Sequence, residues 1–240
     1  NTGIHGDDLT EINNTKKIKN FNDFLYHGLS YIYGPINYLI FYWAYPVLGS
    51  ENLIIYDFIK IICHLFSIFF IFKFACDYLP KDRAVLASVL FIFFPTHDST
   101  IFWYMITPYT FIPALIMYCH HLIRSNKLIL SYPLLLAASF ASYLTPPYII
   151  GLSFIFFLEK SYKKFLLFLS PTIIYIIYYL SVASIYTSSE SVAIERRIDD
   201  NLSFIKFFKI LFLQILSGFD VFFGPSFILK IFSSIYSLSL

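Results

Sequence analysis

The chain has 240 residues, of which 58% are hydrophobic, 21% aromatic and only 13% charged, with a formal net charge of +2 and a mean hydropathy of +0.69. A soluble domain carries about 25% charged residues, so this composition excludes an ordinary soluble domain with a large core. It predicts an all-α polytopic membrane protein, a multi-helix transmembrane bundle. The basic residues are dispersed among short segments, which gives no indication of a nucleic-acid partner.

Residues 1–52 are predicted to form an outer loop followed by interfacial helices. The loop contains residues 5–11, in which three carboxylates lie beside a histidine. Groups of this polarity belong in water, so we expect this short acidic loop at the bilayer surface. Gly34-Pro35 is expected to break an amphipathic helix. The Tyr- and Trp-rich residues 36–48 suit the headgroup level of a membrane.

Residues 53–186 are predicted to contain the transmembrane helices. A span needs about 20 apolar residues to cross about 30 Å of hydrocarbon, and residues 53–76 are the first run of that length, although Asp57 and Lys60 interrupt it. The later apolar runs are 84–95, 101–123, 128–144, 148–158 and 165–186. The shorter ones need flanking residues such as Arg83 and Pro147 to complete a helix.

The last part of the chain is predicted to form an outer loop, 187–203, and a further transmembrane segment, 204–240. Residue 1 is Asn rather than Met, and the sequence ends within an apolar run. We therefore expect a single transmembrane domain over residues 1–240 that is a fragment, lacking the first helix and the C-terminal part.

The connecting segments alternate in charge. Those that carry Lys or Arg are 77–83, 124–127 and 159–164. The intervening segments 96–100 and 145–147 hold neither. Because short loops rich in Lys and Arg stay cytoplasmic, the three basic segments are predicted to face the cytoplasm. The alternation puts the acidic segment 5–11 and the loop 187–203 on the outer face.

Three polar clusters are therefore expected on the outer face. Carboxylates can deprotonate a hydroxyl or hold a divalent cation, and the guanidinium fork of arginine bonds a phosphate bidentately. Acids and arginines on one membrane face fit chemistry on a lipid-linked phosphate. The candidate site residues from these clusters are Asp7, Asp8, His97, Asp98, Arg196 and Arg197.

Each cluster also has a purely structural interpretation. The acidic segment is equally typical of a solvated terminus, and His97-Asp98 of an ordinary turn between helices. Arg196-Arg197 lie among acids that can pair with them in a solvated loop. Trp103 and Tyr104 fit an aromatic belt at the membrane interface, or a surface that stacks on a sugar.

The order of these features resembles the GT-C class of membrane glycosyltransferases, the group holding protein O-mannosyltransferases and lipid A aminoarabinose transferases. The residues that carry the resemblance follow the acidic segment in order: Tyr26-His27, Gly34-Pro35-Ile36, Lys81-Asp82-Arg83-Ala84 and Phe94-Pro95-Thr96-His97-Asp98. It covers roughly residues 5–125. The chain has Asp-Asp where many relatives have Asp-Glu, and Gly-Pro-Ile where many have Pro-Pro-Leu.

The resemblance implies an inverting glycosyltransferase that uses a polyprenyl-phosphate sugar. An acid after the first transmembrane helix is the proposed base of the class, which gives that role to Asp7 or Asp8, with Asp8 favoured. The implied partners are the lipid-linked donor and membrane lipids. The cofactor stays unknown, with a divalent cation on Asp7, Asp8 and Asp98 as a possibility. The expected location is a multi-pass membrane protein with an extracytoplasmic active face. A multi-pass transporter, a lipid-linked polysaccharide flippase and a polymerase are the alternatives.

Overall fold

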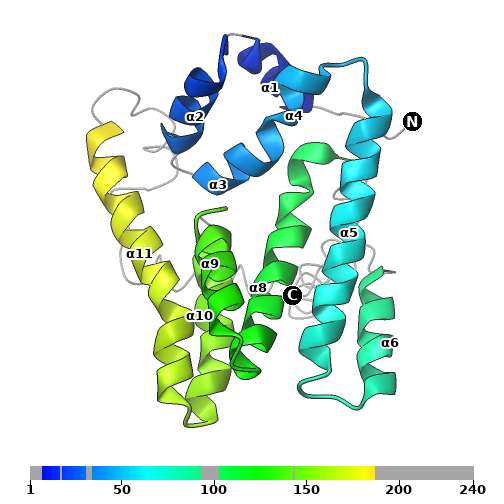
Figure 1. The fold of residues 1–240 in the computed structure, drawn as a ribbon, viewed down its shortest axis with the longest axis vertical. Coiled ribbons are helices and arrows are strands. Elements are labelled where there is room, and N and C mark those ends of the chain that lie inside the picture. Colours follow the sequence, from blue (N-terminus) through cyan, green and yellow to red (C-terminus); the bar gives the residue numbers. More distant parts are fainter. Residues whose placement is uncertain (1–6, 17, 31–33, 93–102, 143, 187–240) are drawn as a thin grey trace, which may run out of the picture. The chain divides into compact units, whose positions relative to one another are not determined.

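The computed structural model describes residues 7–16, 18–30, 34–92, 103–142 and 144–186, and every structural statement below concerns these residues. All regular elements among them are helices (Figure 1). This confirms the predicted all-α class. The chain divides between Ala183 and Ser184 into two units, and the description concerns the first.

Short helices make up the N-terminal region of the described chain. They are α1 (Asp7–Thr15), α2 (Phe21–Ser30), α3 (Pro35–Asn37), a π-helical turn η1 (Tyr38–Tyr42) and α4 (Ala44–Leu48). Asn20 caps α2, since its side-chain oxygen accepts a hydrogen bond of 2.8 Å from the backbone N–H of Asp23. Pro35 begins α3, where its fixed φ and missing N–H suit a first helical position.

The longer helices follow in chain order: α5 (Leu53–Ala75), α6 (Lys81–Ile92), the 3₁₀ turn η3 (Tyr104–Ile106), α8 (Pro108–Arg124), α9 (Leu128–Ser139), α10 (Thr145–Leu158) and α11 (Tyr162–Tyr186). Helix α5 matches the predicted run 53–76. Helices α6 and α10 begin in flanking residues, as their short apolar runs require. Helix α8 starts later than expected, at Pro108, because the preceding residues form η3.

Two of the described helices are long and apolar enough to cross a membrane, Leu53–Ala75 and Tyr162–Ser181. The apolar helices Leu128–Ser139 and Thr145–Leu158 are shorter. At 1.5 Å per residue, 12–14 residues reach about 20 Å, which is less than the hydrocarbon thickness of about 30 Å. The two long helices support membrane association, whereas the polytopic bundle stays a prediction.

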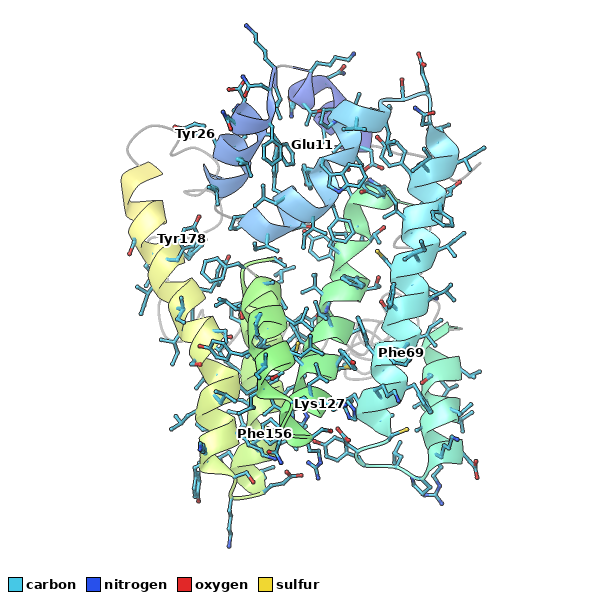
Figure 2. The ribbon with its side chains drawn as sticks, viewed as in Figure 1. Glu11, Tyr26, Phe69, Lys127, Phe156 and Tyr178 are labelled. Atoms are coloured by element: carbon cyan, nitrogen blue, oxygen red, sulfur yellow. The ribbon has the colours of Figure 1, made fainter. Side chains whose placement is uncertain are left out.

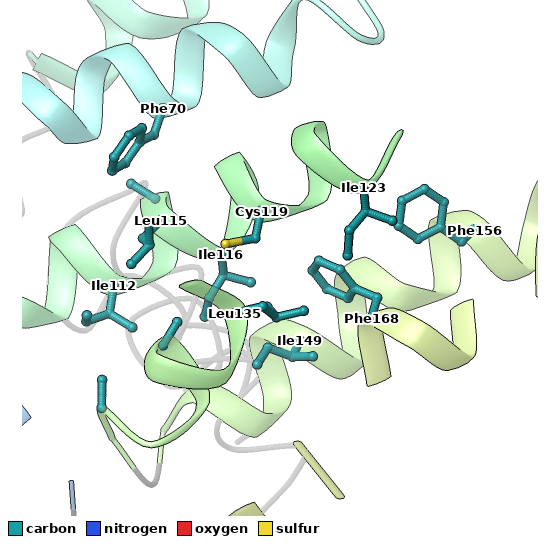
Figure 3. Close-up of a cluster of buried hydrophobic side chains, with 13 residues drawn as sticks. Phe70, Ile112, Leu115, Ile116, Cys119, Ile123, Leu135, Ile149, Phe156 and Phe168 are labelled. Atoms are coloured by element: carbon teal, nitrogen blue, oxygen red, sulfur yellow. The ribbon is translucent and has the colours of Figure 1, made fainter. Parts of the chain in front are cut away.

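A core of buried apolar side chains lies where α8 meets its neighbours (Figure 3). Ile116 and Ile123 of α8 pack with Phe70 of α5, Leu135 of α9 and further residues of α10 and α11. Helix α8 contacts α5, α9 and α10. It is therefore the central element of this helical unit, and its buried face explains why so many of its residues are apolar.

The three basic turns predicted to share one membrane face are joined by polar contacts. Arg124, at the end of α8, donates to Glu159 at 2.6 Å and to the hydroxyl of Tyr78 at 3.2 Å. Lys164 donates to the carbonyl of Arg124 at 2.9 Å. Tyr78 belongs to the turn 77–83, and Glu159 and Lys164 belong to the turn 159–164, so Arg124 connects all three turns at one end of the helices. Lys127 lies at this end and Glu11 at the other (Figure 2).

Candidate functional site

Asp8 lies on the inward face of α1. The side chains of Asp8, Ile12 and Thr15 are buried, whereas most residues between them, such as Leu9, are exposed. Spacings of four and three residues put these side chains on one face of a helix. A carboxyl group therefore occupies a position of α1 that packing would normally give to an apolar side chain.

Two donors from distant segments hold the Asp8 carboxyl group. The Tyr45 hydroxyl donates to Oδ1 at 2.6 Å. The backbone N–H of Met105 donates to the same oxygen at 3.0 Å. The exposed fraction of Asp8 is 0%, and a buried carboxyl group is tolerated only when hydrogen bonds replace its water. These two bonds connect α1 with α4 and η3 around one oxygen atom.

Three buried tyrosines form the wall beside Asp8. The ring centroids of Tyr45 and Tyr104 are 5.6 Å apart, and those of Tyr56 and Tyr104 are 4.8 Å apart, in edge-to-face arrangements. The Tyr104 hydroxyl donates to the carbonyl of Phe41, and the Tyr56 hydroxyl to the carbonyls of Ala44 and Gly49. With the hydroxyls satisfied in this way, the rings form a fixed wall that orients Asp8.

Electrostatics keep the donor to Asp8 protonated. Burial, followed by the nearby Asp8 carboxyl, raises the pKa of Tyr45 far above its ordinary value. Burial likewise raises the pKa of Tyr104. Tyr45 therefore keeps its proton throughout the physiological range and serves only as a hydrogen-bond donor. A buried carboxyl fixed by two donors can act as a positioned base or as a structural anchor.

The described structure includes only part of the predicted site. Asp7 begins α1, but its side chain lies outside the described residues. His97 and Asp98 fall in 93–102, and Arg196 and Arg197 fall in 187–240, both outside the described residues. Their predicted roles as substrate-binding groups, and that of Asp98 as a metal ligand, therefore remain predictions.

The described residues of the acidic segment differ from the expected loop. From Asp7 onward the segment is helical, and Asp8 is fully buried rather than exposed to water. The sequence shows why, because Ile12 and Thr15 continue the inward face of the helix. Tyr104 also differs from the expected belt residue: its exposed fraction is 1%, so its ring packs in the protein and faces neither lipid nor a sugar.

The structure adds residues that sequence reasoning missed, chiefly Tyr45 and the backbone of Met105. Tyr45 lies in an aromatic stretch in which no pattern separates it from its neighbours, and a backbone donor leaves no trace in a sequence. Within the described ranges, no group of three or more His, Cys, Asp or Glu residues is arranged to hold a metal ion.

Comparisons of the chain with protein-family models, with curated proteins and with solved structures find no match.

Proposed function

We propose that this protein transfers a sugar from a polyprenyl-phosphate-linked donor to an acceptor at the outer face of a membrane, as an inverting glycosyltransferase. The observation that supports the proposal is the buried Asp8 carboxyl, fixed by Tyr45 and Met105 beside the first turn of a membrane-length helix, α5. In this proposal the protein is multi-pass. The basic turns face the cytoplasm and Asp8 lies on the extracytoplasmic side.

The proposed reaction is a single displacement. The acceptor oxygen forms a bond to the anomeric carbon on the face opposite the phosphate, and the bond from that carbon to the phosphate oxygen breaks. The acceptor proton goes to Asp8, and the polyprenyl phosphate leaves with the electron pair. Asp7 is the second candidate base. His97, Asp98, Arg196 and Arg197 are proposed to bind substrate, the arginines through the phosphate.

Because Asp8 is buried, this mechanism requires a conformational change that exposes its carboxyl group. With an exposed fraction of 0%, Asp8 meets an acceptor only when the residues around α1 separate. Glu11, three residues later, is partly exposed and is a second carboxyl on the same side of the helix. Comparing Asp8 with Glu11 therefore tests whether the buried or the accessible carboxyl takes the proton.

The test is transfer from a lipid-linked sugar by the purified full-length protein. We expect Asp8→Asn to abolish transfer, because an amide cannot accept a proton and a positioned base contributes about 10²–10⁴-fold. Asp7→Asn should reduce it less or equally, and Glu11→Gln, which changes the accessible carboxyl, should leave transfer intact. If a divalent cation bridges Asp7 and Asp8, both substitutions fail alike and a chelator stops the wild type. Full activity of the Asp7→Asn, Asp8→Asn double variant contradicts the proposal.

A transporter or lipid flippase is the second candidate, and one observation favours it. Lys60 and Asp57 form an ion pair of 2.7 Å within the membrane-length helix α5, and ionisable groups at such positions mark transport pathways. Asp8→Asn separates the two candidates. An enzyme loses turnover and retains donor binding, whereas a transporter reconstituted in vesicles keeps its transport rate.

A further inference from the structure

Lys60 is a buried cation inside a helix of membrane-spanning length. Its side chain is 3% exposed, and its Nζ lies 2.7 Å from Oδ1 of Asp57, whose side chain is 27% exposed. Lys60 comes seven residues after Leu53, about 10 Å along the helix axis at 1.5 Å per residue. If α5 crosses the bilayer, Lys60 lies within the hydrocarbon region.

Stability does not account for this pair. Burying two charges removes their hydration, and their mutual attraction seldom more than offsets that loss. An apolar residue at position 60 would pack without it, as Phe70 does on the same buried face of α5. Charged residues within membrane helices face the protein interior where they serve a ligand or an ion. Lys60 has that orientation.

Lys60 lies one helical turn along α5 from Tyr56, a tyrosine of the wall beside Asp8. It follows Tyr56 by four residues, which puts both side chains on one helix face, one turn apart. Both are buried. The Tyr56 ring packs against Tyr104 at 4.8 Å and against Tyr45 at 6.1 Å, and Tyr45 holds Asp8. The contacts therefore run from Asp8 through Tyr45 to Tyr56, and Lys60 and then mainly apolar side chains follow Tyr56 along α5.

We infer that Lys60 binds the phosphate group of a lipid phosphate, an inference that rests on the proposed function. The donor carries its sugar, phosphate and hydrocarbon tail in that order, and the site presents a carboxyl, a cation and an apolar helix face in the same order. An ammonium group bonds phosphate oxygen strongly because the bond is charge-assisted. Asp57 pairs with Lys60 in the structure, and the phosphate would replace Asp57 as the partner of Lys60.

The experiment measures binding rather than transfer. The full-length protein in nanodiscs is titrated with a polyprenyl monophosphate and, separately, with the uncharged polyprenol of equal length. The ratio of the two dissociation constants reports recognition of the phosphate. Inorganic phosphate is added as a competitor, which separates a site for free phosphate from one that needs the lipid. The variants are Lys60→Met, Lys60→Arg and Asp57→Asn.

We expect the wild type to prefer the phosphate. Lys60→Met should reduce that preference roughly tenfold to a hundredfold, the effect of losing one charged hydrogen bond. Lys60→Arg should retain most of it, because the charge remains. Asp57→Asn should retain or increase it, because the competing carboxylate is gone. Inorganic phosphate should compete only weakly.

Three results would overturn the inference: no wild-type preference, an unchanged preference in Lys60→Met, or an equal loss in Lys60→Met and Asp57→Asn, which indicates a pair that is only structural. A variant that fails to fold is recognised because it no longer binds polyprenol. If Lys60→Met fails in this way, the phosphate preference of Lys60→Arg tests the inference instead. Neither probe carries a sugar, so phosphate binding can hold even if transfer fails. Conversely, transfer that depends on Asp8 can hold without a role for Lys60.

Discussion

The hydroxyl of Tyr45 donates a hydrogen bond of 2.6 Å to Oδ1 of Asp8, a residue 37 positions earlier in the chain. This contact joins α1 to α4 through groups that are both buried. Because the N–H of Met105 donates to the same oxygen, η3 is fixed to the same point. One carboxyl group thus organises three segments that the sequence keeps far apart.

Removal of the Tyr45 hydroxyl is expected to destabilise this region. Tyr45→Phe preserves the ring contacts with Tyr56 and Tyr104 but takes one donor away from a buried carboxyl. Removing one partner of a buried hydrogen-bonded group costs about 1–3 kcal/mol, so we expect a loss of unfolding free energy of about that size. Thermal denaturation in detergent, followed by circular dichroism, is the measurement.

A matched control is available in Tyr26, which is 69% exposed. Tyr26→Phe should leave the melting temperature unchanged. The single variant Asp8→Leu and the double variant Tyr45→Phe, Asp8→Leu complete a thermodynamic cycle, because a leucine side chain cannot accept the hydrogen bond. If the two substitutions prove additive, the hydrogen bond does not couple α1 to α4, and the anchoring role of Asp8 is wrong.

The helical class and most helix positions could be predicted, because apolar runs interrupted by Pro, Gly and short basic segments are local signals. The flanking residues added to α6 and α10 follow from the length a helix needs. The same reasoning grouped the basic turns at one end, and the contacts of Arg124 with Glu159 and Tyr78 agree with it.

The surroundings of Asp8 could not be predicted in the same way. Its partners, Tyr45 and Met105, lie 37 and 97 positions away, and nothing in the local pattern marks them. Three acids in a short stretch indicated a solvated loop, whereas tertiary packing turned one of them inward. Burial depends on which face of a short helix meets the rest of the fold, and that contact is long-range.

Gly34 is predicted to tolerate no side chain. An added Cβ would overlap the carbonyl oxygen of Ala141, a backbone atom that cannot rotate away. The neighbouring N–H of Ile36 donates to the carbonyl of Phe140 at 3.1 Å, which fixes this close approach. We expect Gly34→Ala to lower the unfolding free energy by about 1–3 kcal/mol, as overpacking does.

The same substitution at Gly151 is expected to stabilise the protein. Gly151 lies in α10, and an added Cβ meets nothing within 4 Å. Alanine is favoured over glycine in a helix by about 0.5–1 kcal/mol, so Gly151→Ala should raise stability. Both variants are compared by thermal denaturation in one detergent. Equal effects at the two positions would contradict the close contact between Gly34 and Ala141.

Substitution of Arg124 is expected to have a larger effect than loss of its ion pair with Glu159 alone. Arg124 and Glu159 are 32% and 35% exposed, so solvent screens their attraction, and Glu159→Gln should cost under about 1 kcal/mol. Arg124→Met also loses the hydrogen bond to Tyr78 and the cation–π contact with its ring, 4.7 Å from the centroid.

Burial raises the pKa of Tyr78 to about 12, an effect that Arg124 opposes. We therefore expect Arg124→Met to raise this pKa, and ultraviolet titration of the phenol measures it.

The orientation of the chain can be tested with single cysteines. Ser125 and Ser161 lie in turns that Arg124 and its partners join at one end of the helices. Ser99 and Ser189 are predicted on the other side and lie outside the described residues. A membrane-impermeant thiol reagent should label Ser99→Cys and Ser189→Cys in intact cells. It should label Ser125→Cys and Ser161→Cys only after lysis.

The native Cys76 is an internal reference for this experiment, because it is exposed and lies at the turn end of α5. It should behave like the cysteines at positions 125 and 161, and Cys76→Ser removes its background signal. Because contacts join the turns, Cys76 and the cysteines at these two positions should react from the same side of the membrane, whichever way the chain is oriented. The side from which all three react then decides between the two faces. Labelling of the turn end in intact cells would put Asp8 and Lys60 toward the cytoplasm, where an extracytoplasmic transfer reaction has no access to them.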